Sequence, residues 1–565
     1  MMKGSTILGI WDGHDSGAAL IHDGIVRVAV NEERFTRRKM EVHFPVNAIS
    51  HCICAVGISP RDIDRIAYTT TDFSLTLTRC IPAVKDSYYY VRRKIRPARF
   101  PNLNRKILNY TGRMRPNRIT GILSDMKVQS TLKKLGLAKI PLSRIEHHHA
   151  HAASAFFTSG MQRALVVTMD GLGDGLSATV YRGEGSTLER LAEVKTRDSL
   201  GLFYQEVTSL LGMRILEDEG KVMALADHAG SLGEKNPMRG LFEKKDGRVR
   251  ARMGPERRYW YLKRLSEEHP PHVFARMAQE TLEYHTARFI GTHLRRTGLR
   301  NLCLAGGLFS NVKNNRNIID AVKPIDWYVF PHMGDGGLAV GAGLAASSIG
   351  NKRKTYALKD VKLGPSFSSN EIRNTLERYS DRIEWEYETN CSKVAADAII
   401  QGEVVFWFQG AMEYGPRALG SRSILANPED MAVKDRLNST IKRRQWYQPF
   451  CPSILRSDAY HLFEPCVRSD PCMTMAYRIT KQGCLKGVRD NNGCCRPQII
   501  PDTDKAAYTR LLKEMKRRTG IGAVLNTSFN IHGEPIVTTP EEALDVFLRT
   551  DEGILVIGEY VVRRK

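Results

Sequence analysis

The chain has 565 residues, which exceeds the roughly 250–300 residues that one hydrophobic core supports, so the sequence predicts two or more domains. A hydrophobic content of 42% excludes a disordered chain, and the absence of an apolar run of about 18 residues predicts no membrane span and no membrane partner. The net charge is +23, and the eleven cysteines lack zinc-ligand spacing, so we expect reduced thiols and a cytoplasmic protein.

The first predicted elements form a β-meander near the N-terminus. An apolar strand over residues 7–11 runs into an Asp-Gly pair at 12–13, and a second strand covers 18–21. Another Asp-Gly pair at 23–24 then turns the chain into a third strand over 25–30. Acidic residues this early in the chain argue against a signal peptide.

The same pattern returns about 158 residues further along the chain. In ALVVTMDGLGDGLSATVYRG, residues 164–183, an apolar strand again meets an Asp-Gly pair, Asp170-Gly171, and a Gly-rich bend with a second acid, Asp174, follows. Glycines in such turns let backbone N–H groups approach phosphate, and the acid can hold a metal or orient a hydroxyl. The two copies favour an internal duplication, as in the actin, sugar-kinase and Hsp70 architecture that binds nucleotide between its halves.

A basic stretch separates the two hairpins. Residues 85–134 carry 14 Lys and Arg against two Asp and supply about half of the charge excess. Basic runs interleaved with Tyr and Phe can bind phosphates and stack on bases, and beside an acceptor pocket they would favour an acidic or phosphorylated acceptor. A solvated insertion is the alternative, and charge runs form it more often.

Four histidines lie within five positions of IEHHHAHAASAFF, residues 145–157. On a helix His147 and His151 share one face, whereas the two histidines between them point elsewhere. The neighbouring alanines leave room for a metal ion close to the helix. Two imidazoles need a carboxylate from elsewhere, for which Asp335 and Asp170 are candidates. An isolated histidine pair is more often structural, so these loop aspartates are what favours a metal site.

Two later segments repeat a strand–turn–helix pattern. In residues 301–318 a strand meets a Gly-Gly turn before a helix that starts near Asn311. In residues 329–346 a strand is followed by Asp335 in a Gly-rich turn and by a helix of small residues. Both segments place backbone amides and the positive end of a helix at a loop, which suits phosphate. Such turns are also common in α/β proteins of other functions.

The C-terminal part has a different chemistry. The polar, basic residues 350–360 predict a linker between a first domain, residues 1–350, and a second, residues 361–565. Arginine binds phosphate through two parallel hydrogen bonds, and lysine neutralises charge that moves to a leaving group. Surface charge in a basic protein is the alternative. The phosphate-binding candidates are Arg417, Lys442, Arg496, Asn526 and Ser528.

Nine motifs stand in one order along nearly the whole chain, except residues 72–140: WDGHDSGAAL, NEERFTRRK, HHHAHAASAFF, SLGLFYQEVTSLLG, EGKVMALA, GGLFSNVKNN, YGPRALGSRSIL, PFCPSIL and LNTSFNIHGEPIV. In these motifs the chain resembles the O-carbamoyltransferases, a family that includes the nodulation-factor, cephem and nebramycin-type enzymes. The resemblance implies an α/β fold with a duplicated actin-like (ASKHA) domain in residues 1–350, which carries 72–140 as a basic insertion. It further implies a YrdC-like α/β domain in residues 361–565.

The resemblance also implies roles for single residues of the first domain. His147, His151 and Asp335 hold a metal, usually iron. Asp170 lies near the acceptor and the nucleotide. The acceptor hydroxyl is handled at Asp12 and His14, where the histidine is either the general base or a residue that stabilises the turn. The residues expected to bind nucleotide or carbamoyl phosphate are Lys39, Gly171, Gly173, Asp174, Gly306, Gly307, Asn311, Arg417, Lys442, Arg496, Asn526 and Ser528.

One position departs from the family pattern. Gln448 stands in YQPF where the family usually has a basic residue, so one anion contact is weaker here. Arg444 is close in the sequence and is a candidate to replace that contact. The alternative consequence is a lower affinity for carbamoyl phosphate.

The activity implied by the resemblance is ATP-dependent O-carbamoyl transfer. The second domain makes carbamoyl-adenylate from carbamoyl phosphate and ATP with Mg²⁺. The first domain, with a divalent metal expected to be Fe²⁺, transfers the carbamoyl group to a hydroxyl of a small-molecule acceptor, sugar-like or acidic.

Three alternatives remain open at this stage. A tRNA-directed transferase is suggested by the net charge of +23, so nucleic acid is a partner that is possible but not favoured. A protein-directed transferase acting on cysteine would carry zinc modules and an acylphosphatase domain, which the sequence lacks. A regulatory module with a decayed site is opposed by the complete sets of candidate residues. The oligomeric state stays open, with a homodimer among the possibilities.

Overall fold

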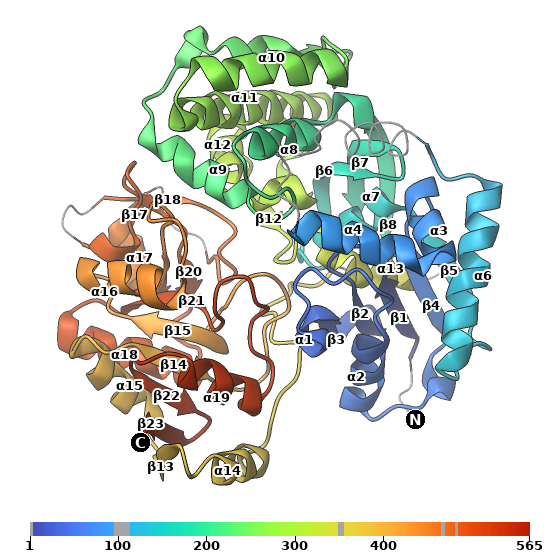
Figure 1. Cartoon of the computed structure of the whole chain (residues 1–565). Helices are drawn as coiled ribbons and strands as arrows, with labels where there is room; N and C mark the ends of the chain where they lie inside the picture. The colour runs from blue at the N-terminus through green and yellow to red at the C-terminus, as the bar shows by residue number, and fades with distance from the viewer. Residues whose placement is uncertain (1–3, 95–113, 349–354, 465–468, 481–483) are drawn as a thin grey trace. The chain divides into compact units, whose positions relative to one another are not determined.

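The computed structural model describes residues 4–94, 114–348, 355–464, 469–480 and 484–565 (Figure 1). The protein is a mixed α/β structure whose chain divides into two compact units. Unit 1 consists of Met1–Glu32 and Met40–Lys359, and unit 2 consists of Glu33–Lys39 and Asp360–Lys565. Residues 95–113 of the predicted basic insertion lie outside the described residues.

Unit 1 contains two five-stranded sheets with the same topology. Their orders are β3-β2-β1-β4-β5 and β8-β7-β6-β11-β12. In each sheet three antiparallel strands form a meander, and two later strands run parallel to its first strand. This shared topology agrees with the duplication that the repeated Asp-Gly pattern predicted. The strands are β1 (Thr6–Trp11), β2 (Gly17–His22), β3 (Ile25–Asn31), β4 (Arg65–Thr69), β5 (Leu142–Ile145), β6 (Arg163–Gly173), β7 (Leu176–Glu184), β8 (Thr187–Lys195), β11 (Asn301–Ala305) and β12 (Asp326–Val329).

Two helices of small residues connect these sheets. Helix α13 (Leu338–Ser348) packs against β1, β2 and β4 of the first sheet, and α7 (His147–Phe157) packs against β6 and β11 of the second. The two helices also pack against each other, so they form the layer between the sheets. A Cβ atom on Gly341 would lie 2.0 Å from the Ala150 carbonyl oxygen, which shows how closely the two backbones approach. The alanines of α7 and the alanines and glycines of α13 make this contact possible.

The remaining helices of unit 1 cover the outer faces. Helix α12 starts after Asn311, as the sequence predicted, because the Asn311 side chain accepts a hydrogen bond from the Asn314 N–H. The core beside the second sheet contains fully buried Phe203, Phe274 and Phe289. These helices are α2 (Val46–Val56), α3 (Phe73–Cys80), α4 (Pro82–Lys94), α6 (Arg118–Lys134), α8 (Leu200–Leu210), α9 (Glu219–Leu225), α10 (Pro255–Glu268), α11 (Pro271–Thr297) and α12 (Val312–Val322), and a small hairpin joins β9 (Phe242–Lys245) to β10 (Arg248–Ala251).

Unit 2 is built on an eight-stranded mixed sheet in the order β13-β23-β22-β14-β15-β21-β16-β20, with a separate sheet β17-β18-β19. Its strands are β13 (Ile383–Tyr387), β14 (Val405–Phe408), β15 (Arg422–Ala426), β16 (Cys451–Leu455), β17 (Phe463–Glu464), β18 (Tyr477–Ile479), β19 (Cys494–Cys495), β20 (Gln498–Ile500), β21 (Ala523–Ser528), β22 (Ile554–Ile557) and β23 (Tyr560–Arg564). Its helices are α1 (Glu33–Thr36), α14 (Ser369–Arg378), α15 (Cys391–Ile400), α16 (Met431–Arg436), α17 (Arg456–Leu462), α18 (Ala507–Thr519) and α19 (Pro540–Leu548). None of the helices in the described part of the chain combines the length and the apolar character that crossing a membrane requires.

The units differ in two places from the expected domains 1–350 and 361–565. The segment Glu33–Lys39 belongs to unit 2, because the Arg34 and Arg37 guanidinium groups donate hydrogen bonds to its carbonyl groups, such as that of Gly415. Residues 355–359 of the expected linker belong to unit 1, where the Val26 N–H donates a hydrogen bond to the Tyr356 hydroxyl. Short polar segments are therefore fixed by partners far away in the sequence, which composition does not reveal.

Candidate functional site

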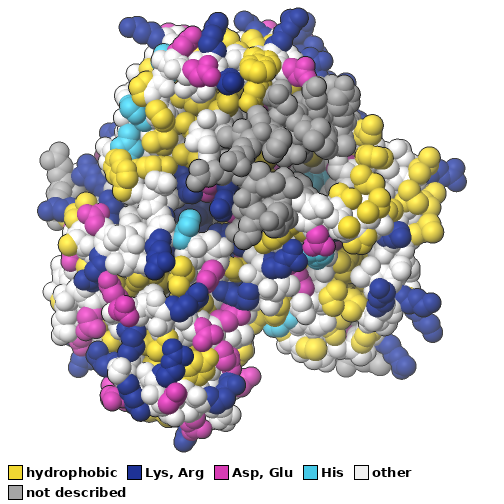
Figure 2. Space-filling model, in the orientation of Figure 1, with side chains coloured by type: hydrophobic (Ala, Val, Ile, Leu, Met, Phe, Trp, Pro, Cys, Tyr) yellow, Lys and Arg dark blue, Asp and Glu magenta, His cyan; other side chains and the backbone are white. Residues whose placement is uncertain are grey.

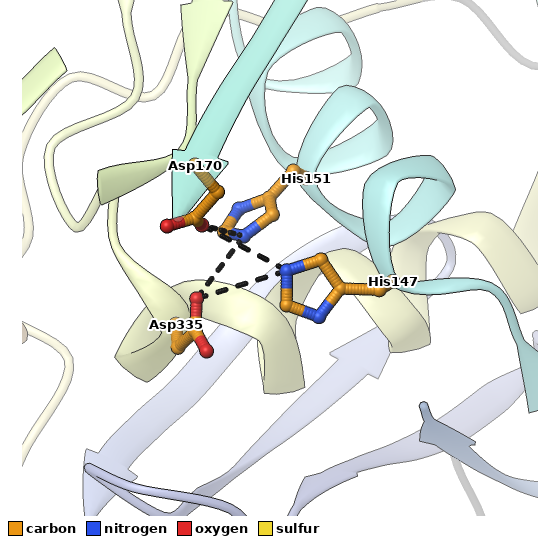
Figure 3. Close-up of side chains that lie close together, drawn as sticks. All are labelled: His147, His151, Asp170 and Asp335. Carbon is orange, nitrogen blue, oxygen red and sulfur yellow. Dashed lines mark ion pairs between the residues drawn. The ribbon is translucent and has the colours of Figure 1, made fainter. Parts of the chain in front are cut away.

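Four side chains of unit 1 converge on one point (Figure 3). One ligand-type atom from each of His147, His151, Asp170 and Asp335 lies within 4.8 Å of the other three. His151 Nε2 is 3.1 Å from Asp170 Oδ2 and 3.4 Å from Asp335 Oδ1. His147 Nε2 is 3.7 Å and 3.8 Å from the same two oxygens. The histidine pair and both carboxylates that the sequence offered are therefore together in space.

Each of the four comes from an element whose local structure fixes it. The histidines are one turn apart on α7, whose first turn is capped by the Glu146 carboxylate. Asp170 lies in β6, where the pairing with β7 is irregular between Met169 and Gly173. Asp335 begins the turn that leads into α13. Because α7 and α13 pack directly together, the two histidines and Asp335 are held in fixed relation.

The histidine rings are oriented by second partners. The Thr70 hydroxyl lies 3.1 Å from His147 Nδ1, so the Nε2 atom of that ring faces the cluster. A Cβ atom on Gly173 would lie 2.1 Å from the ring of His147, and only glycine leaves space for the imidazole there. Within the described residues His147 Nε2, His151 Nε2 and Asp170 Oδ2 are buried and make no hydrogen bond of acceptable geometry. These three ligand-type atoms face one another and lack hydrogen bonds, and a bound cation would satisfy them.

The electrostatics of the cluster favour positive charge. Burial lowers the pKa of His147, but the Asp335 and Asp170 carboxylates outweigh burial and raise the pKa to about 10. Burial raises the pKa of Asp170, and the two histidines reverse the effect and hold it well below its usual range. Positive charge between the carboxylates is therefore stabilising, and either protons on the histidines or a metal ion can supply it. The donor set of two imidazoles and two carboxylates fits a divalent transition metal.

The other two histidines of α7 do not join the cluster. His148 is buried, its Nδ1 atom lies 2.8 Å from the Thr168 hydroxyl, and burial lowers its pKa to about 4. His149 lies beside the ring of Tyr181. Their positions agree with the helical geometry that separated them from His147 and His151.

His14 lies at the edge of the cluster. Its Nε2 atom is 3.3 Å from Asp335 Oδ2, and 28% of its side chain is exposed. The ring is therefore reachable from solvent while it contacts a residue of the cluster. A general base for an incoming hydroxyl needs both properties.

Asp12 lies away from the cluster and is held by cations. The Arg79 guanidinium donates to both carboxylate oxygens, at 2.6 Å and 2.8 Å, and Lys85 Nζ donates to the Asp12 carbonyl oxygen at 2.7 Å. Burial raises the pKa of Asp12, but the charges of Arg79 and Lys85 outweigh it and lower the pKa to about 2. A carboxylate this acidic is a poor base, so the geometry favours a structural ion pair. A cavity of about 260 Å³ adjoins Asp12, and its wall includes Thr78 and Lys127.

In unit 1, the glycines and polar residues expected to bind nucleotide lie around the cluster of two histidines and two aspartates. The Gly171 N–H donates to the Asp170 carboxylate, and a Cβ atom on Gly307 would lie 3.0 Å from it. Gly306 has a φ of 108°, and a Cβ there would lie 2.2 Å from the Met169 carbonyl oxygen. These glycines allow close packing behind Asp170.

Asp174 and Asn311 have local partners of their own. Asp174 accepts hydrogen bonds from the N–H groups of His147 and Thr71. Burial and the charge of Asp72 raise the pKa of Asp174 to about 7. The Asn311 amide pairs with Gln279 and caps α12. Both residues thus stabilise backbone near the cluster.

In unit 2 the predicted residues form a group of cations. Lys442 is buried and donates to the Asn530 side chain at 2.9 Å and also contacts Ser528. Burial and the charges of Arg444 and Lys39 hold the pKa of Lys442 well below its usual range. The Lys39 charge thus acts on Lys442 from the segment that the chain inserts into unit 2.

Three arginines extend this group. Arg496 lies 3.2 Å from the Cys451 sulfur, and Arg444 lies over the ring of Phe450. Burial and the charge of Arg496 lower the pKa of Arg417 to about 9. Within the described residues no carboxylate forms an ion pair with Arg417, Arg444, Arg496 or Lys442. A bound polyanion would neutralise cations that repel one another without a counter-charge.

Asn526 lies in β21 beside this group. Its amide donates to the Ser453 hydroxyl and the Ala418 carbonyl oxygen, and its own carbonyl oxygen is buried without a hydrogen-bond partner in the described structure. A buried acceptor without a partner is unusual in folded proteins. Sequence reasoning missed Thr70 and Arg79, which contact His147 and Asp12, because neither residue stands in a recognisable motif.

Comparisons with known proteins agree on one family. Residues 6–344 match the family described as "Carbamoyltransferase N-terminus", and residues 396–564 match the one described as "Carbamoyltransferase C-terminus". The nodulation protein NolNO of Sinorhizobium fredii is 34% identical over 98% of this chain and 79% of its own length. The 3'-hydroxymethylcephem-O-carbamoyltransferase of Streptomyces clavuligerus is 31% identical over 33% of this chain and 35% of its own. A solved structure of full-length HypF in the phosphate- and nucleotide-bound form covers 63% of this chain and 58% of its own with 14% identity, and its TM-score of 0.38 is too low to support an argument.

Proposed function

Because the chain belongs to the carbamoyltransferase family, we propose that it is an ATP-dependent O-carbamoyltransferase with a small-molecule acceptor. The observation that carries the proposal is the presence of two complementary sites in one chain. Unit 1 holds a buried cluster of imidazoles and carboxylates, and unit 2 holds a group of cations without paired carboxylates in the described structure. The first suits a metal-assisted group transfer and the second suits the binding of ATP and carbamoyl phosphate.

In unit 2 the proposed reaction is the formation of carbamoyl-adenylate. Water hydrolyses carbamoyl phosphate to carbamate and inorganic phosphate, and a carbamate oxygen then attacks the α-phosphorus of ATP, which releases pyrophosphate and leaves carbamoyl-adenylate. Arg417, Arg444 and Arg496 bind the phosphate oxygens, and Lys442 neutralises the charge that develops on the leaving group. The carbonyl oxygen of Asn526 orients the carbamoyl amide.

In unit 1 the proposed step is transfer of the carbamoyl group to an acceptor hydroxyl, with release of AMP. His147, His151, Asp335 and Asp170 would hold the metal, which supplies Lewis acidity for a carbonyl oxygen when bound. His14 takes the proton of the attacking hydroxyl. The cavity of about 260 Å³ beside Asp12 receives part of the acceptor. The cationic side chains that line this cavity, such as Lys127, favour an acceptor that carries negative charge.

We also propose a fold for each of the two units. The two sheets of unit 1, with their shared topology, support a duplicated actin-like domain, and we propose a YrdC-like fold for unit 2. The first would hold nucleotide or its carbamoylated form, and the second would activate the carbamoyl group. A chain that carries both sites limits the loss of a hydrolysable intermediate to water.

The test separates the two half-reactions by measuring ATP consumption that depends on carbamoyl phosphate, in the absence of any acceptor. Ser528→Glu should abolish it, because a carboxylate there pairs with Lys442 and repels phosphate. His151→Ala should retain it and lose carbamoyl transfer. Ser439→Glu and His272→Ala are matched controls outside both sites and should behave like the unmodified protein. Consumption of ATP by Ser528→Glu at the normal rate would contradict the proposal.

A further inference from the structure

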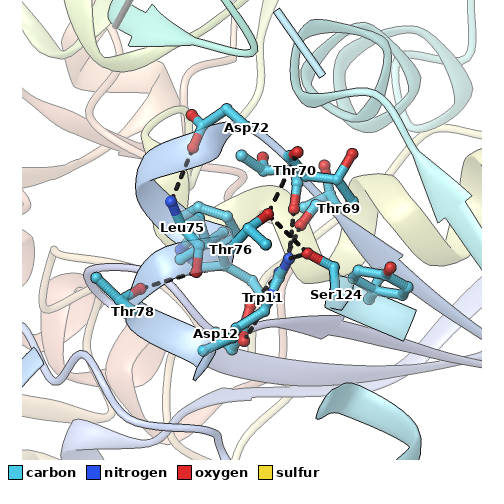
Figure 4. A network of polar contacts seen from close by, with 12 residues as sticks. Trp11, Asp12, Thr69, Thr70, Asp72, Leu75, Thr76, Thr78 and Ser124 are labelled. Atoms are coloured by element: carbon cyan, nitrogen blue, oxygen red, sulfur yellow. Dashed lines mark hydrogen bonds and ion pairs between the residues drawn. The ribbon is translucent and has the colours of Figure 1, made fainter. Parts of the chain in front are cut away.

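Helices α3 and α6 of unit 1 pack against each other with polar side chains on the inside. The hydroxyls of Thr76 on α3 and Ser124 on α6 are both buried and lie 2.8 Å apart. Arg79 donates to the Ser124 hydroxyl at 3.1 Å, and Thr76 also donates to the Thr120 carbonyl oxygen. Figure 4 shows this network, with Asp12 at its other side. Small hydroxyl residues and one arginine thus contribute to the contact between the two helices.

The outer face of the same two helices carries several large apolar side chains. On α6 the side chains of Ile119 and Met126 are 70% and 63% exposed, and they are among the most exposed large hydrophobic residues of the described chain. Figure 2 shows hydrophobic side chains gathered on the right of the view, where Figure 1 has α6. The exposed apolar residues of α6 stand at positions i, i+3, i+4 and i+7, and those of α3 and its C-cap at i, i+4 and i+8: Ile119, Ile122, Leu123 and Met126, with Phe73, Leu77 and the C-cap residue Ile81.

This arrangement departs from that of an ordinary water-facing helix pair, although α6 also buries Val128 and Leu132. A surface helix normally buries its apolar stripe and exposes its polar one, because removal of apolar surface from water is the main gain on folding. Here six large apolar side chains on two adjacent helices, together with that of Ile81 at the C-cap of α3, remain exposed, while the hydroxyls of Thr76 and Ser124 are buried. Contiguous apolar patches of this kind mark surfaces that are covered by something else.

The chemistry of the patch selects its occupant. Helices that lie in a bilayer interface present large apolar side chains to the acyl chains and lysines or arginines to the headgroups. The C-terminal half of the same exposed side of α6 carries Lys133 and Lys134. Asp125, the single acid of α6, is engaged with Tyr68 and Arg144. A second copy would bring like charges together, whereas an anionic surface would attract them.

We propose that the outer face of α3 and α6 binds the surface of an anionic lipid bilayer. The seven apolar side chains enter the interface between headgroups and acyl chains, and the lysines contact the headgroup charges. The expectation of no membrane partner was drawn from the absence of a spanning segment, and a helix pair that lies on a membrane needs no such segment. Residues of the candidate catalytic sites take no part in this contact.

The experiment measures flotation of the purified full chain with vesicles of equal parts phosphatidylglycerol and phosphatidylcholine, and with vesicles of phosphatidylcholine alone. No ATP or acceptor is present, so the outcome is independent of the proposed transferase activity. We expect binding to the anionic vesicles that weakens as salt is raised. The double variant Ile119→Ser and Met126→Ser should lower the partition coefficient by about tenfold or more. Lys133→Glu with Lys134→Glu should lower it at low salt and have less effect at high salt.

The control is Ile325→Ser, which removes an exposed isoleucine elsewhere in unit 1 and should bind vesicles like the unmodified protein. All variants change exposed side chains, and each should retain carbamoyl phosphate-dependent ATP consumption. If no vesicle binds, or if the serine variants bind as well as the control, the proposal is wrong. A dimer that the serine variants dissociate, without vesicle binding, would instead identify a second copy as the occupant. Capture of an acidic protein without vesicle binding would likewise overturn it.

Discussion

Thr70 occupies a backbone conformation that a β-branched residue rarely adopts, with a φ of 67°. Two partners hold it there. Arg79 donates a hydrogen bond of 2.7 Å to the Thr70 carbonyl oxygen, and the Thr70 hydroxyl contacts His147 Nδ1. Strained residues of this kind persist when the surroundings fix them, and they gather at functional sites. We infer that Thr70 sets the orientation of His147.

The corresponding prediction concerns metal affinity. Thr70→Val keeps the shape of the side chain and removes the hydroxyl that orients His147, so it should weaken metal binding by about 10–100-fold. Thr70→Ser retains the hydroxyl and should restore most of the affinity. Metal content after dialysis and the absorption spectrum of cobalt-loaded protein measure the effect without an activity assay. Equal metal content in the Val and Ser variants would show that the hydroxyl has no such role.

We predict that Asp12 stabilises the folded protein. Asp12→Asn leaves Arg79 and Lys85 buried without a counter-charge, which should cost about 3–5 kcal/mol of unfolding free energy at pH 7. The pKa of Asp12 is 3.8 when unfolded and about 2 when folded, so its ionised form stabilises the fold above pH 3.8. That contribution, about 2 kcal/mol, disappears as the pH falls from 3.8 to about 2. Urea unfolding at several pH values should show the gap between the two proteins narrowing with acid, and a gap independent of pH would refute the ion pair.

At the residue scale the sequence predicted the four residues of the cluster better than the residues that orient them. His147 and His151 were paired by helical spacing, and Asp170 and Asp335 were selected as loop carboxylates, and all four meet in the structure. Thr70 could not be found this way, because its left-handed φ and its contact depend on a tertiary environment. The sequence likewise offered no sign that Asp12 would be neutralised.

At the scale of elements, the contact between α7 and α13 sets the position of the cluster. Gly341→Ala would place a methyl group 2.0 Å from the Ala150 carbonyl oxygen, so the two helices must move apart. We expect a loss of about 1–3 kcal/mol in stability and a lower metal content, although Gly341 touches none of the four side chains. Gly220→Ala is the control, because a Cβ there meets no atom within 4 Å. Normal metal content in Gly341→Ala would show that the contact is not decisive.

The elements themselves were largely predictable where short-range patterns define them. The expected strands over 18–21 and 25–30 correspond to β2 and β3, and the helix near Asn311 begins where its cap predicts. The exposure of large apolar side chains on α3 and α6 was not predictable. Periodicity gives a helix its apolar stripe, but it does not tell which face turns inward when hydroxyls and an arginine form the contact.

At the scale of the whole molecule, unit 2 includes a segment from near the N-terminus. Residues 33–39 reach it through Arg34 and Arg37, whose guanidinium groups donate to main-chain carbonyls of Gly415, Pro535 and Ile536. A chain of residues 360–565 alone should therefore unfold at a lower temperature than unit 2 in the full protein. It should also bind ATP more weakly, because Lys39 is missing. Calorimetry of the fragment, with and without a synthetic peptide of residues 33–39, measures both effects. A fragment as stable as unit 2 of the full chain would refute this prediction.

The placement of residues 33–39 also has a consequence for protein synthesis. A ribosome adds roughly 5–20 residues each second, so this segment leaves the exit tunnel long before residue 536, one of its partners, has been made. Unit 2 thus cannot complete its fold from residues 360–565 alone. Its segment of residues 33–39 is translated first and can join the unit only after the later residues have been made. Splitting the gene between the two units would leave that early part on the wrong polypeptide, which favours keeping both units in one reading frame.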